Sequence, residues 1–539
     1  MKHQTSNIKY QILLSCIVLL ASFLRLHQLG QNPPSLDWDE ASLGYNAYSI
    51  LKTGKDEFGR FLPVSIRSFE DYKPAFYTYA AIPTVALFGL NEFAVRLPSA
   101  LFGILTVLVS YFLARDLFGK KIGLLVSLFL AVSPWHLQFS RVAFEANVAL
   151  FWVTLGIWSF HKGLKSGIWF ILSALAFAIS FYTYHSPRLV VPLLLLGLLI
   201  LWRRTLWEKR GWLLISAVVG ALLLIPFIKE VTSEGRARLG SVTVLTPEGR
   251  LDESIKRAEY DQSRHDWLGK ILHNRRIVYA LAVAQGYLDH FNLDFLFLTG
   301  DSPLRHHAPD MGMLYVWDAA FIVIGVLTLL RRRYVYLWWW FLVAPAASAI
   351  TTGTPHAVRA LLYLPLYQIF TAVGVIKVWC WSKSHLSGHA HQIFRGFIIL
   401  LFLVNIAFYL EMYYVHAPIE SAKEWQFGYK QAVAEIVKQE PNVEKVVMTY
   451  GYDQPHVYLL FNKPIDPSWY QSLWHGGEVK RDTRSFDKYE FRKIDWETDK
   501  QLRNTLFVGT PGEIPPDAPG LIAQIYFPDG SVAFRIVKS

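Results

Sequence analysis

Residues 97–138 read LPSALFGILTVLVSYFLARDLFGKKIGLLVSLFLAVSPWHLQ, which is two apolar runs separated by a short basic segment. A helix needs about 20 mostly apolar residues to cross a hydrocarbon core roughly 30 Å thick. The runs at 97–114 and 122–138 approach that length, and the segment 115–121 between them carries three basic residues. Because loops rich in Lys and Arg stay in the cytosol, this pattern predicts a helical hairpin of a polytopic α-helical membrane protein.

Nine further apolar segments extend the pattern along the chain. They lie at 10–28, 147–160, 167–184, 189–202, 212–228, 314–330, 335–350, 360–379 and 396–413. Basic clusters such as Arg331 to Arg333 recur in every second connecting loop, so we expect about eleven transmembrane helices with a cytosolic N-terminus. The resulting external loops are 29–96, 139–146, 185–188, 229–313 and 351–359.

The apolar stretch Ala75–Leu90 is treated separately, because counting it as a span would invert the charge pattern upstream of Arg115. Its Pro83 and its mixture of Tyr and Ala suit a helix that lies along the outer membrane surface. We therefore expect interfacial helices in the first external loop, with about 12 or 13 spans as the alternative count.

Composition agrees with a membrane protein and excludes other classes. The 539 residues are 53% hydrophobic and 18% charged, with a mean hydropathy of +0.26, which excludes a disordered chain. The formal net charge is +11, yet Lys and Arg form short clusters between apolar runs and no long basic stripe. We therefore expect membrane lipids as partners and no nucleic acid.

From about Ala417 onward the composition becomes that of a water-soluble domain. Residues 1–413 are therefore expected to form the transmembrane part, and residues 414–539 a small extracytoplasmic α/β domain. We expect a helix at Ala422–Gln439. Strands are expected at Val443–Tyr450, Thr505–Gly509 and Ile522–Phe527.

The run Asp37-Trp38-Asp39-Glu40 places three acids directly after the first span, at an expected external membrane edge. Adjacent carboxylates repel one another, which can raise the pKa of one of them, and such a group can act as a general base toward a hydroxyl. The alternative is structural, with Asp39 as the N-cap of a helix over Glu40–Leu51. The sequence leaves both interpretations open.

A second acid, Glu145, lies in the segment SRVAFEAN at residues 140–147, on the same expected side of the membrane. Its spacing from Arg141 is i, i+4. A helix-surface ion pair is therefore the structural alternative to a catalytic role.

Isolated cations occur at external span ends, against the general charge trend. They are Lys73, Arg96, Arg188, Arg305 and Arg359. Guanidinium groups form bidentate bonds with phosphate, so several of them converging on one face would bind a phosphodiester. Snorkelling to lipid headgroups is the alternative for any one of them.

The external loops also contain His306, His307 and His356, which are potential metal ligands. Because the adjacent pair lacks the i, i+4 spacing of a helical zinc site, hydrogen bonding within the loops is the default expectation. The sequence contains no phosphate-cradling glycine loop and no nucleophile elbow, which argues against an ATPase or a serine hydrolase.

The order of these motifs resembles that of the GT-C membrane glycosyltransferases, in particular the bacterial members of the protein O-mannosyltransferase and lipid A aminoarabinose transferase superfamily. The resemblance covers residues 10–413, and the C-terminal domain also looks like the tail of many bacterial members. The motifs are Asp39-Glu40, Lys73-Pro74, Arg96-Leu97-Pro98-Ser99-Ala100, Ser133-Pro134, Ser140-Arg141 to Glu145, and His356-x-x-Arg359. Each motif is weak alone, and their order is specific.

The resemblance implies a GT-C transmembrane catalytic domain that moves a sugar from a polyprenyl-phosphate-linked donor to an acceptor hydroxyl, with inversion. The reaction would take place on the extracytoplasmic face of the plasma membrane, which is the inner membrane of a bacterium. The acceptor is a protein, a lipid or a glycan. The long loop 229–313 is expected to form a lid on the acceptor side.

The resemblance also implies two sets of site residues. The catalytic set is Asp39 as general base, Glu40 beside it, and Glu145 as the second acid near the acceptor. The set expected to bind the donor phosphate is Lys73, Arg359, His356, Arg188 and Arg96. Some GT-C enzymes use a divalent metal ion and others do not, so a metal ion at Asp39 remains an open expectation.

Two other functions remain open at this stage. A transporter or flippase of a lipid-linked sugar would use similar charges, although its typical internal repeats and paired broken helices are not evident. A non-enzymatic scaffold for the external domain is the third hypothesis. The donor sugar and the acceptor depend on the shape of the site and cannot be read from these motifs.

Overall fold

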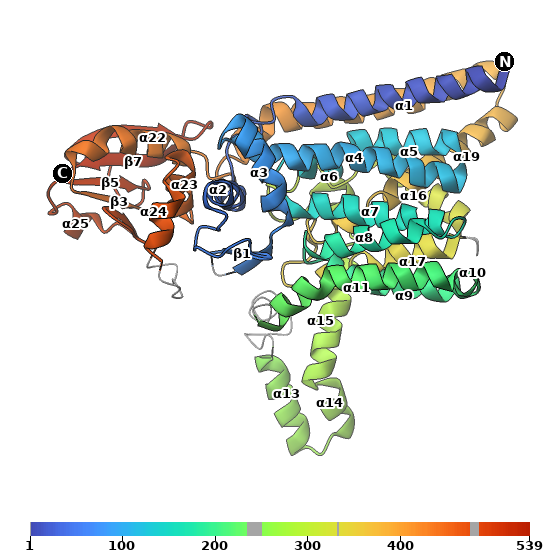
Figure 1. Cartoon of the computed structure of the whole chain (residues 1–539), viewed down its shortest axis with the longest axis horizontal. Helices are drawn as coiled ribbons and strands as arrows, with labels where there is room; N and C mark the ends of the chain where they lie inside the picture. Colours follow the sequence, from blue (N-terminus) through green and yellow to red (C-terminus); the bar gives the residue numbers. More distant parts are fainter. Residues whose placement is uncertain (1, 70, 234–250, 331–333, 475–483) are drawn as a thin grey trace.

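A bundle of long helices and a domain that contains a β-sheet lie at opposite ends of the molecule's long axis (Figure 1). The computed structural model describes residues 2–69, 71–233, 251–330, 334–474 and 484–539. The basic cluster Arg331 to Arg333 and residues 234–250 of the long external loop lie outside these described residues.

Each of the eleven expected apolar segments falls on a helix or on two helices joined by a break. The bundle consists of α1 (Lys2–Leu26), α4 (Glu92–Phe118), α5 (Lys120–Val132), α6 (Pro134–Ser140), α7 (Glu145–Gly163), α8 (Trp169–Phe181), α9 (Pro187–Leu201), α10 (Arg203–Glu208), α11 (Arg210–Ser233), α16 (Val316–Leu329), α17 (Val335–Val343), α18 (Ala346–Ala349), η3 (Leu361–Tyr363), α19 (Leu366–His385) and α20 (Gly388–Glu411).

Five helices in the described part of the chain are long and apolar enough to cross a membrane. The α5–α6 pair makes a sixth if its 59° bend lies within one span, and five further apolar helices are 10–17 residues long. The chain is therefore a multi-pass membrane protein. Eleven remains a prediction for its number of spans.

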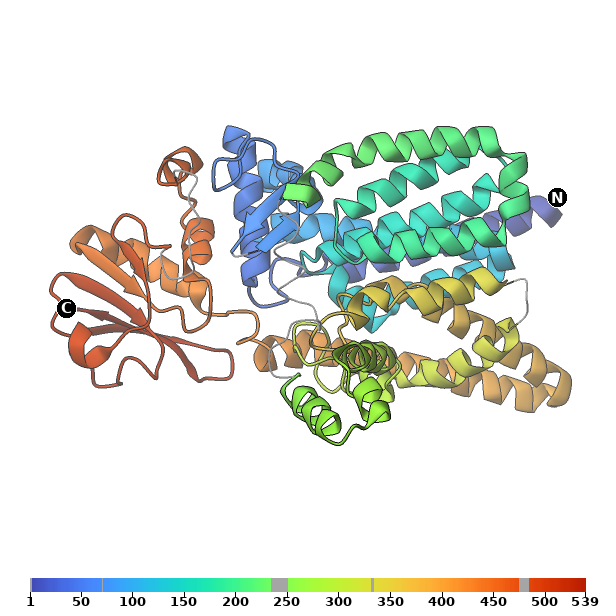
Figure 2. The same ribbon diagram turned by 90° about the horizontal axis from the view of Figure 1, so that it is seen from below.

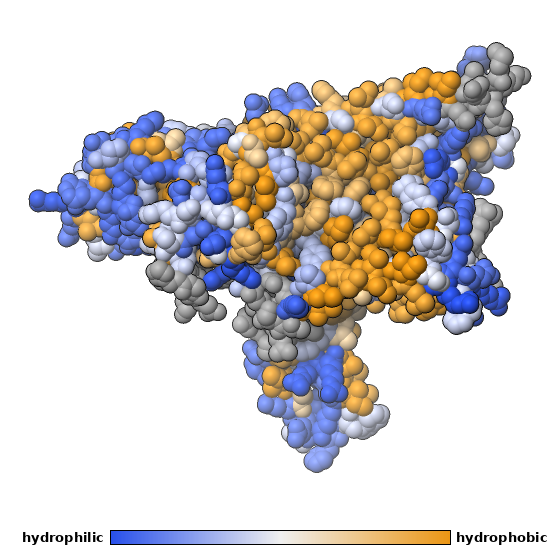
Figure 3. Space-filling view, in the orientation of Figure 1, coloured by the Kyte–Doolittle hydropathy of each residue, from blue (hydrophilic) through white to orange (hydrophobic). Residues whose placement is uncertain are grey.

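The outer surface of the bundle is apolar over a broad belt (Figure 3). Leu222, Leu327 and Ile393 are 61%, 63% and 72% exposed. Hydrophilic residues cover most of the C-terminal domain and the opposite edge of the molecule in the same view (Figure 3). An apolar belt between two polar ends is what a lipid bilayer requires of a protein that crosses it.

The bend between α5 and α6 has a local cause. Proline has no backbone N–H and is tolerated in the first turn of a helix, so Pro134 begins α6 and cannot continue α5. The change of direction carries Trp135 toward two external loops. Its backbone N–H donates to the Met313 carbonyl at 3.1 Å, and its indole N–H donates to the Ala357 carbonyl at 3.2 Å. One short helix thus holds both loops.

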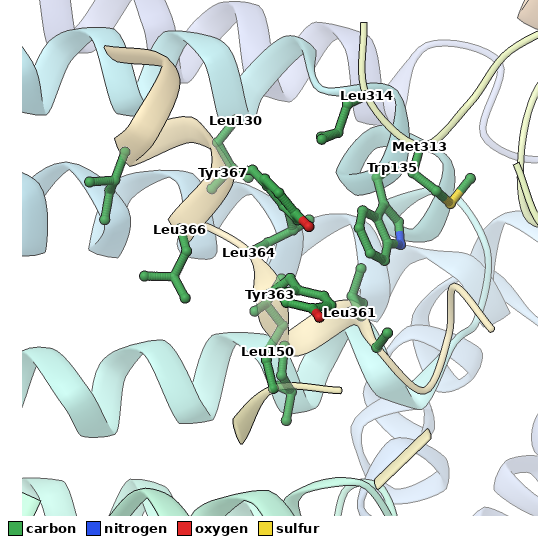
Figure 4. Packing of buried hydrophobic residues seen from close by; sticks show 14 of the residues in the cluster. Leu130, Trp135, Leu150, Met313, Leu314, Leu361, Tyr363, Leu364, Leu366 and Tyr367 are labelled. Atoms are coloured by element: carbon green, nitrogen blue, oxygen red, sulfur yellow. The ribbon is translucent and has the colours of Figure 1, made fainter. Parts of the chain in front are cut away.

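Aromatic and leucine side chains form the core beneath these loops (Figure 4). Trp135, Tyr363 and Leu364 are fully buried, and the rings of Tyr363 and Tyr367 lie 5.3 Å apart. Burial of large aromatic side chains contributes strongly to stability, so the loops rest on a fixed base.

The first external loop forms a small layer at the end of the bundle that faces the C-terminal domain (Figures 1 and 2). It contains α2 (Trp38–Thr53), the antiparallel hairpin β1 (Ser65–Ser68) and β2 (Asp71–Pro74), and α3 (Phe76–Phe88). The α3 helix contains Pro83 and coincides with the stretch expected to be an interfacial helix. It has 13 residues, as does α8 of the bundle, so its position at the membrane surface stays a prediction.

The long external loop divides into two parts. Its helices α13 (Asp252–Ser263), α14 (Trp267–Leu272) and α15 (Arg275–Asp289) project from the bundle as an arm (Figure 1). The segment after the π-helix η1 (Asp294–Leu298) returns to the core, where the Leu314 N–H donates to the Leu296 carbonyl at 2.7 Å. In the described part of this loop, the returning segment brings Arg305 and His306 against expected site residues, and His290 at the end of α15 contacts the His356 N–H at 3.3 Å. The lid over 229–313 stays a prediction.

The C-terminal domain follows η4 (Met412–His416) and α21 (Ala417–Glu420). Its sheet has the order β4-β3-β5-β7-β6, in which β4, β3 and β5 are parallel and the other pairs antiparallel. The strands are β3 (Lys445–Met448), β4 (Tyr489–Phe491), β5 (Thr505–Gly509), β6 (Leu521–Tyr526) and β7 (Val532–Lys538). The helices are α22 (Tyr429–Gln439), η5 (Glu440–Asn442), α23 (Pro455–Asn462), α24 (Pro467–Ser472) and α25 (Trp496–Asp499).

The three expected strands occur at β3, β5 and β6, while β4 and β7 were not expected. The expected helix begins seven residues late, at Tyr429 and not at Ala422. Gly428 has φ +106°, a left-handed conformation that a helix cannot pass through. Residues 421–428 form turns instead.

The two domains share a packed boundary along α2. The Tyr45 hydroxyl donates to the Ile465 carbonyl at 3.1 Å, and the Tyr458 hydroxyl donates to the Leu36 carbonyl at 3.2 Å. A Cβ added to Gly44 would lie 2.6 Å from both Phe461 in α23 and Val95 in α4. The absence of a side chain at Gly44 thus lets the helix fit between the bundle and the C-terminal domain.

Candidate active site

The helix α2 begins at Trp38 because Asp37 and Glu40 form a capping box. The Asp37 carboxylate accepts the Glu40 N–H at 2.8 Å, and the Glu40 carboxylate accepts the Asp37 N–H at 3.3 Å. The structural alternative that made Asp39 the N-cap is therefore wrong. Asp39 lies in the first turn, where capping is already complete, so its carboxylate can serve another purpose.

Glu40, the next residue, is fully buried in a bidentate pair with Arg96 of α4. Arg96 Nε and Nη2 each donate to one carboxylate oxygen at 2.9 Å. Arg96 Nη1 donates to the Leu29 and Pro33 carbonyls, and the Ala143 N–H donates to Glu40 Oε1 at 2.9 Å. This enclosed arrangement favours a positioning role for both residues over the expected catalytic role of Glu40 and phosphate contact of Arg96.

Asp39 has a different environment. Lys73, on strand β2, forms an ion pair through its Nζ with Asp39 Oδ1. The Asp39 side chain is 37% exposed and that of Lys73 only 11%, so the carboxylate is the accessible member of the pair.

Glu145, the first residue of α7, lies near the same ammonium group. Burial lowers the pKa of Lys73, but the negative charges of Asp39 and Glu145 outweigh it and the pKa is raised. Two predicted acids, from α2 and α7, thus lie near the cation on β2.

Arg305 connects the returning segment of the long loop to the start of α2. Its Nη1 lies 3.2 Å from Asp37 Oδ2, its Nε lies 3.9 Å from Glu424 Oε2, and its guanidinium lies 4.7 Å from the centre of the Trp38 ring. Burial raises the pKa of Asp37 to about 7, and Arg305 opposes that rise. The repulsion expected among adjacent acids also contributes, through Asp39 and Glu40, and the group it affects is Asp37.

Arg188 and Arg359, two of the cations expected to bind the donor phosphate, lie on neighbouring loops. Arg359 Nη1 donates to Thr351 Oγ1 at 2.8 Å, and its backbone carbonyl accepts the Ser186 hydroxyl at 3.0 Å. Arg188 is the second residue of α9, and its Nη1 lies 2.8 Å from His185 Nδ1. The Ser186 bond therefore joins the loop of Arg188 to the loop of Arg359.

His356 lies between this group and Arg305. Its ring centre is 5.2 Å from that of His306, whose Nδ1 lies 2.7 Å from Asp301 Oδ2. Burial holds the pKa of His356 well below its usual range, and the positive charges of Arg359 and Arg305 act in the same direction. His356 is therefore neutral near pH 7, and Arg359 is the charged member of the predicted pair.

Sequence reasoning missed two parts of this arrangement. Asp301 was not considered a site residue, because a lone acid in a loop carries no spacing signal. Arg305 was recognised as an external cation but not selected for the site, since nothing in the chain order places it against residue 37. The expected Arg141–Glu145 surface pair is also not the role of Arg141. Its guanidinium is buried and donates to the Tyr413 hydroxyl and to the Leu24 and Asn32 carbonyls.

Comparison with known families gives matches to part of the sequence. The profile of the family described as dolichyl-phosphate-mannose-protein mannosyltransferase matches residues 72–229. This range begins one residue before Lys73 and includes Arg96, Glu145 and Arg188, whereas Asp39 and Arg359 lie outside it. A candidate mannosyltransferase of Bacillus subtilis, YkcB, is 24% identical over 178 residues, which is 32% of this chain and 24% of that protein. The match thus spans about a quarter of the length of YkcB.

Comparison with solved structures covers nearly the whole chain. The crystal structure of ArnT from Cupriavidus metallidurans bound to undecaprenyl phosphate has a TM-score of 0.54 with 13% identity, and the match covers 98% of each chain. The chain has the GT-C fold. An oligosaccharyltransferase of Archaeoglobus fulgidus, tethered to an acceptor peptide, has a TM-score of 0.50 with 13% identity and coverage of 97% of this chain and 74% of its own.

Within this GT-C chain, α2, which carries Asp39, lies between the bundle and the C-terminal domain (Figure 1). Lys73 lies on β2 of the same layer, and Glu145 begins α7 of the bundle. The low identities show the fold alone. The chemistry of the site therefore depends on the residues of this chain.

Proposed function

We propose that this GT-C protein transfers a sugar from a polyprenyl-phosphate-linked donor to an acceptor hydroxyl, with inversion, on the extracytoplasmic face of the plasma membrane. The observation that carries the proposal is the grouping of Asp39, Lys73 and Glu145 from three separate elements at the end of an apolar bundle. A carboxylate and a cation are the two groups that such a transfer needs.

In the proposed reaction Asp39 takes the proton of the acceptor hydroxyl as its oxygen attacks the anomeric carbon. The bond between that carbon and the donor phosphate oxygen breaks, and the leaving polyprenyl phosphate keeps the electron pair. Lys73 stabilises the negative charge that develops on the phosphate. Attack from the face opposite the leaving group gives the inverted glycoside.

The Asp39–Lys73 ion pair suggests how the base becomes available. The ammonium group of Lys73 is bound to Asp39. A donor phosphate would compete for this ammonium group and leave the Asp39 carboxylate to accept a proton. Its 37% exposure means that an acceptor hydroxyl can reach it without a large rearrangement.

The other predicted residues take supporting roles in the proposal. We assign Glu145 to the acceptor side of the site. We assign Arg359 and Arg188 to the lipid phosphate. His356 is neutral, so it would contribute a hydrogen bond and no charge. Glu40 and Arg96 would fix the start of α2 and thereby position Asp39.

The test compares Asp39→Asn with Asp529→Asn in purified full-length protein reconstituted into vesicles with a lipid-linked sugar donor. Loss of the general base should lower the rate of glycoside formation by about 10²- to 10⁴-fold in Asp39→Asn. Asp529 is an exposed turn residue of the C-terminal domain whose carboxylate accepts hydrogen bonds from the Ser531 N–H and hydroxyl, so its variant should keep full activity.

Two outcomes would contradict the proposal. Full activity of Asp39→Asn would remove the general-base role. Movement of labelled lipid-linked sugar across the vesicle membrane, with no glycosidic bond formed by the unaltered protein, would favour a flippase instead.

A further inference from the structure

Two loops far apart in sequence bring Asp301, His306 and His356 together beside the proposed site. One ligand atom of each residue lies within 4.8 Å of the ligand atoms of the other two. Asp301 and His306 come from the returning segment of the long loop, and His356 comes from the loop before η3. All three are buried or mostly buried, and the side chain of Asp301 has no exposed surface.

Two buried polar atoms in this cluster have no hydrogen-bond partner among the described residues: Asp301 Oδ1 and His356 Nδ1. An unsatisfied buried acceptor costs on the order of 1–3 kcal/mol, and more when it belongs to a charged group. In native proteins such groups are normally satisfied by the protein, by ordered water or by an ion. A carboxylate oxygen and an imidazole nitrogen are both electron-pair donors, so the missing partner is a cation or a proton donor.

The backbone around the cluster holds the acid in place. The Ala357 N–H donates to Asp301 Oδ2 at 2.8 Å, which ties the loop of His356 to the carboxylate. His307, the adjacent histidine, is turned away from the cluster, and its two ring nitrogens contact the Ala308 and Asp301 carbonyls at 2.9 Å. Only His306 of the adjacent pair is therefore available as a ligand.

We propose that Asp301, His306 and His356 bind one Zn²⁺ ion, or a divalent transition-metal ion of similar preference, with a fourth position open to water or to a substrate oxygen. Two imidazoles and one carboxylate form a donor set that suits Zn²⁺. In a tetrahedral site the ligand atoms would lie about 3.3 Å apart. The present 2.7 Å between His306 Nδ1 and Asp301 Oδ2 therefore requires a small opening of the loop on binding.

This site goes beyond the proposed function, because that function assigns no metal and gives a role to only one of the three residues, His356. Its effect on the site would be one of positioning. Arg305, which contacts Asp37, precedes His306 directly, and Arg359 follows His356 by three residues. A bound ion would lock the two loops to one another and so fix both cations relative to α2.

The experiment measures metal content and leaves activity aside. Full-length protein is purified in detergent without chelator, dialysed against equimolar Zn²⁺, and analysed by inductively coupled plasma mass spectrometry. The unaltered protein should hold about one Zn²⁺ per chain, and Co²⁺ in its place should give the intense visible absorption of a tetrahedral site. Asp301→Asn and His306→Gln should each lower the bound Zn²⁺ at least tenfold.

The matched control is His273→Gln. His273 pairs with Asp261 on the projecting arm, so the chain offers a second Asp–His pair that has no third ligand among the described residues. This variant should keep the full Zn²⁺ content. Thermal unfolding of every variant identifies any that fail to fold, and in that case the Co²⁺ spectrum of the unaltered protein decides.

The proposal is overturned if the unaltered protein holds no Zn²⁺ after dialysis, or if folded Asp301→Asn and His306→Gln keep it. Loss of metal from His273→Gln with retention in the other two would place the ion on the arm and equally overturn it. Failure of sugar transfer in any of these proteins has no bearing on this result, so the two proposals fail separately.

Discussion

Two adjacent carboxylates of α2 form ion pairs of opposite character. Glu40 is enclosed with Arg96, with side chains 1% and 0% exposed, and every bond to it is made by the protein. Asp39 meets Lys73 with more than a third of its own side chain exposed. A charged residue at a membrane edge is therefore not by itself evidence of a catalytic role. What separates the two acids is whether a substrate could still reach them.

The largest expected effect comes from breaking the enclosed pair. In Glu40→Gln the guanidinium of Arg96 keeps its charge in a buried position without a counter-charge, so the free energy of unfolding should fall by about 3–5 kcal/mol. Denaturant unfolding in detergent measures it. Asp39→Asn is the matched control and should change stability by less than about 1 kcal/mol, because its pair is partly hydrated. An equal loss of unfolding free energy in both variants would contradict the distinction between the enclosed and the accessible ion pair.

Glu57, a third acid of the same loop, differs from both because it accepts a hydrogen bond from a neutral amide. Glu57 Oε1 accepts the Asn46 amide at 2.9 Å, and burial raises the pKa of Glu57 to about 7. The folded pKa lies above the unfolded value near 4, so stability is fully present below pH 4 and is lost as pH rises through 7. The loss should be on the order of 3 kcal/mol.

Melting temperatures between pH 4 and pH 8 test this dependence. Glu57→Gln should show a smaller fall over that range than the unaltered protein. Asp37, whose pKa burial also raises to about 7, should account for much of the fall that remains. A variant with the same slope as the unaltered protein would contradict the assignment to Glu57.

The accessible pair should respond in activity more than in stability. Lys73→Ala removes the cation proposed to stabilise the leaving phosphate, so the transfer rate should fall about 100-fold, and Lys73→Arg should recover part of it. Rates measured at saturating acceptor, with unfolding measured alongside, separate the two effects. Lys52→Ala, on the same loop and over the Tyr48 ring, provides a lysine control that should retain activity.

The smallest effect is expected at an exposed pair across the domain boundary. Lys430 Nζ lies 2.6 Å from Glu92 Oε1, and the lysine side chain is 61% exposed. Lys430→Ala should change the unfolding free energy by about 0–1 kcal/mol. A loss comparable to that of Glu40→Gln would show that burial is not what distinguishes these pairs.

Much of the fold could be predicted because bilayer thickness imposes a length on every apolar segment. All eleven segments coincide with helices, and α3 falls on the stretch assigned to the membrane surface. Strand β5 was predicted to the residue. Strands β4 and β7 were not, since short strands in a mixed sheet depend on neighbours far away in sequence.

The site was predictable only in part. Asp39, Lys73 and Glu145 were named from motif order, and the structure brings them together. The same reasoning placed Glu40 and Arg96 in the site, because a sequence does not show that two charged residues will enclose one another. Asp301 carried no signal, since its partners lie on another loop.

The close fit of α2 at Gly44 has a consequence for engineering. The helix that carries Asp39 is bounded on one side by Val95 of the bundle and on the other by Phe461 of the C-terminal domain. The C-terminal domain therefore cannot be exchanged for that of another protein without changing the packing of α2. In a chimera that takes this domain from another protein, the surface of the grafted domain would not match α2, the helix that carries Asp39. The graft would therefore have to include α2.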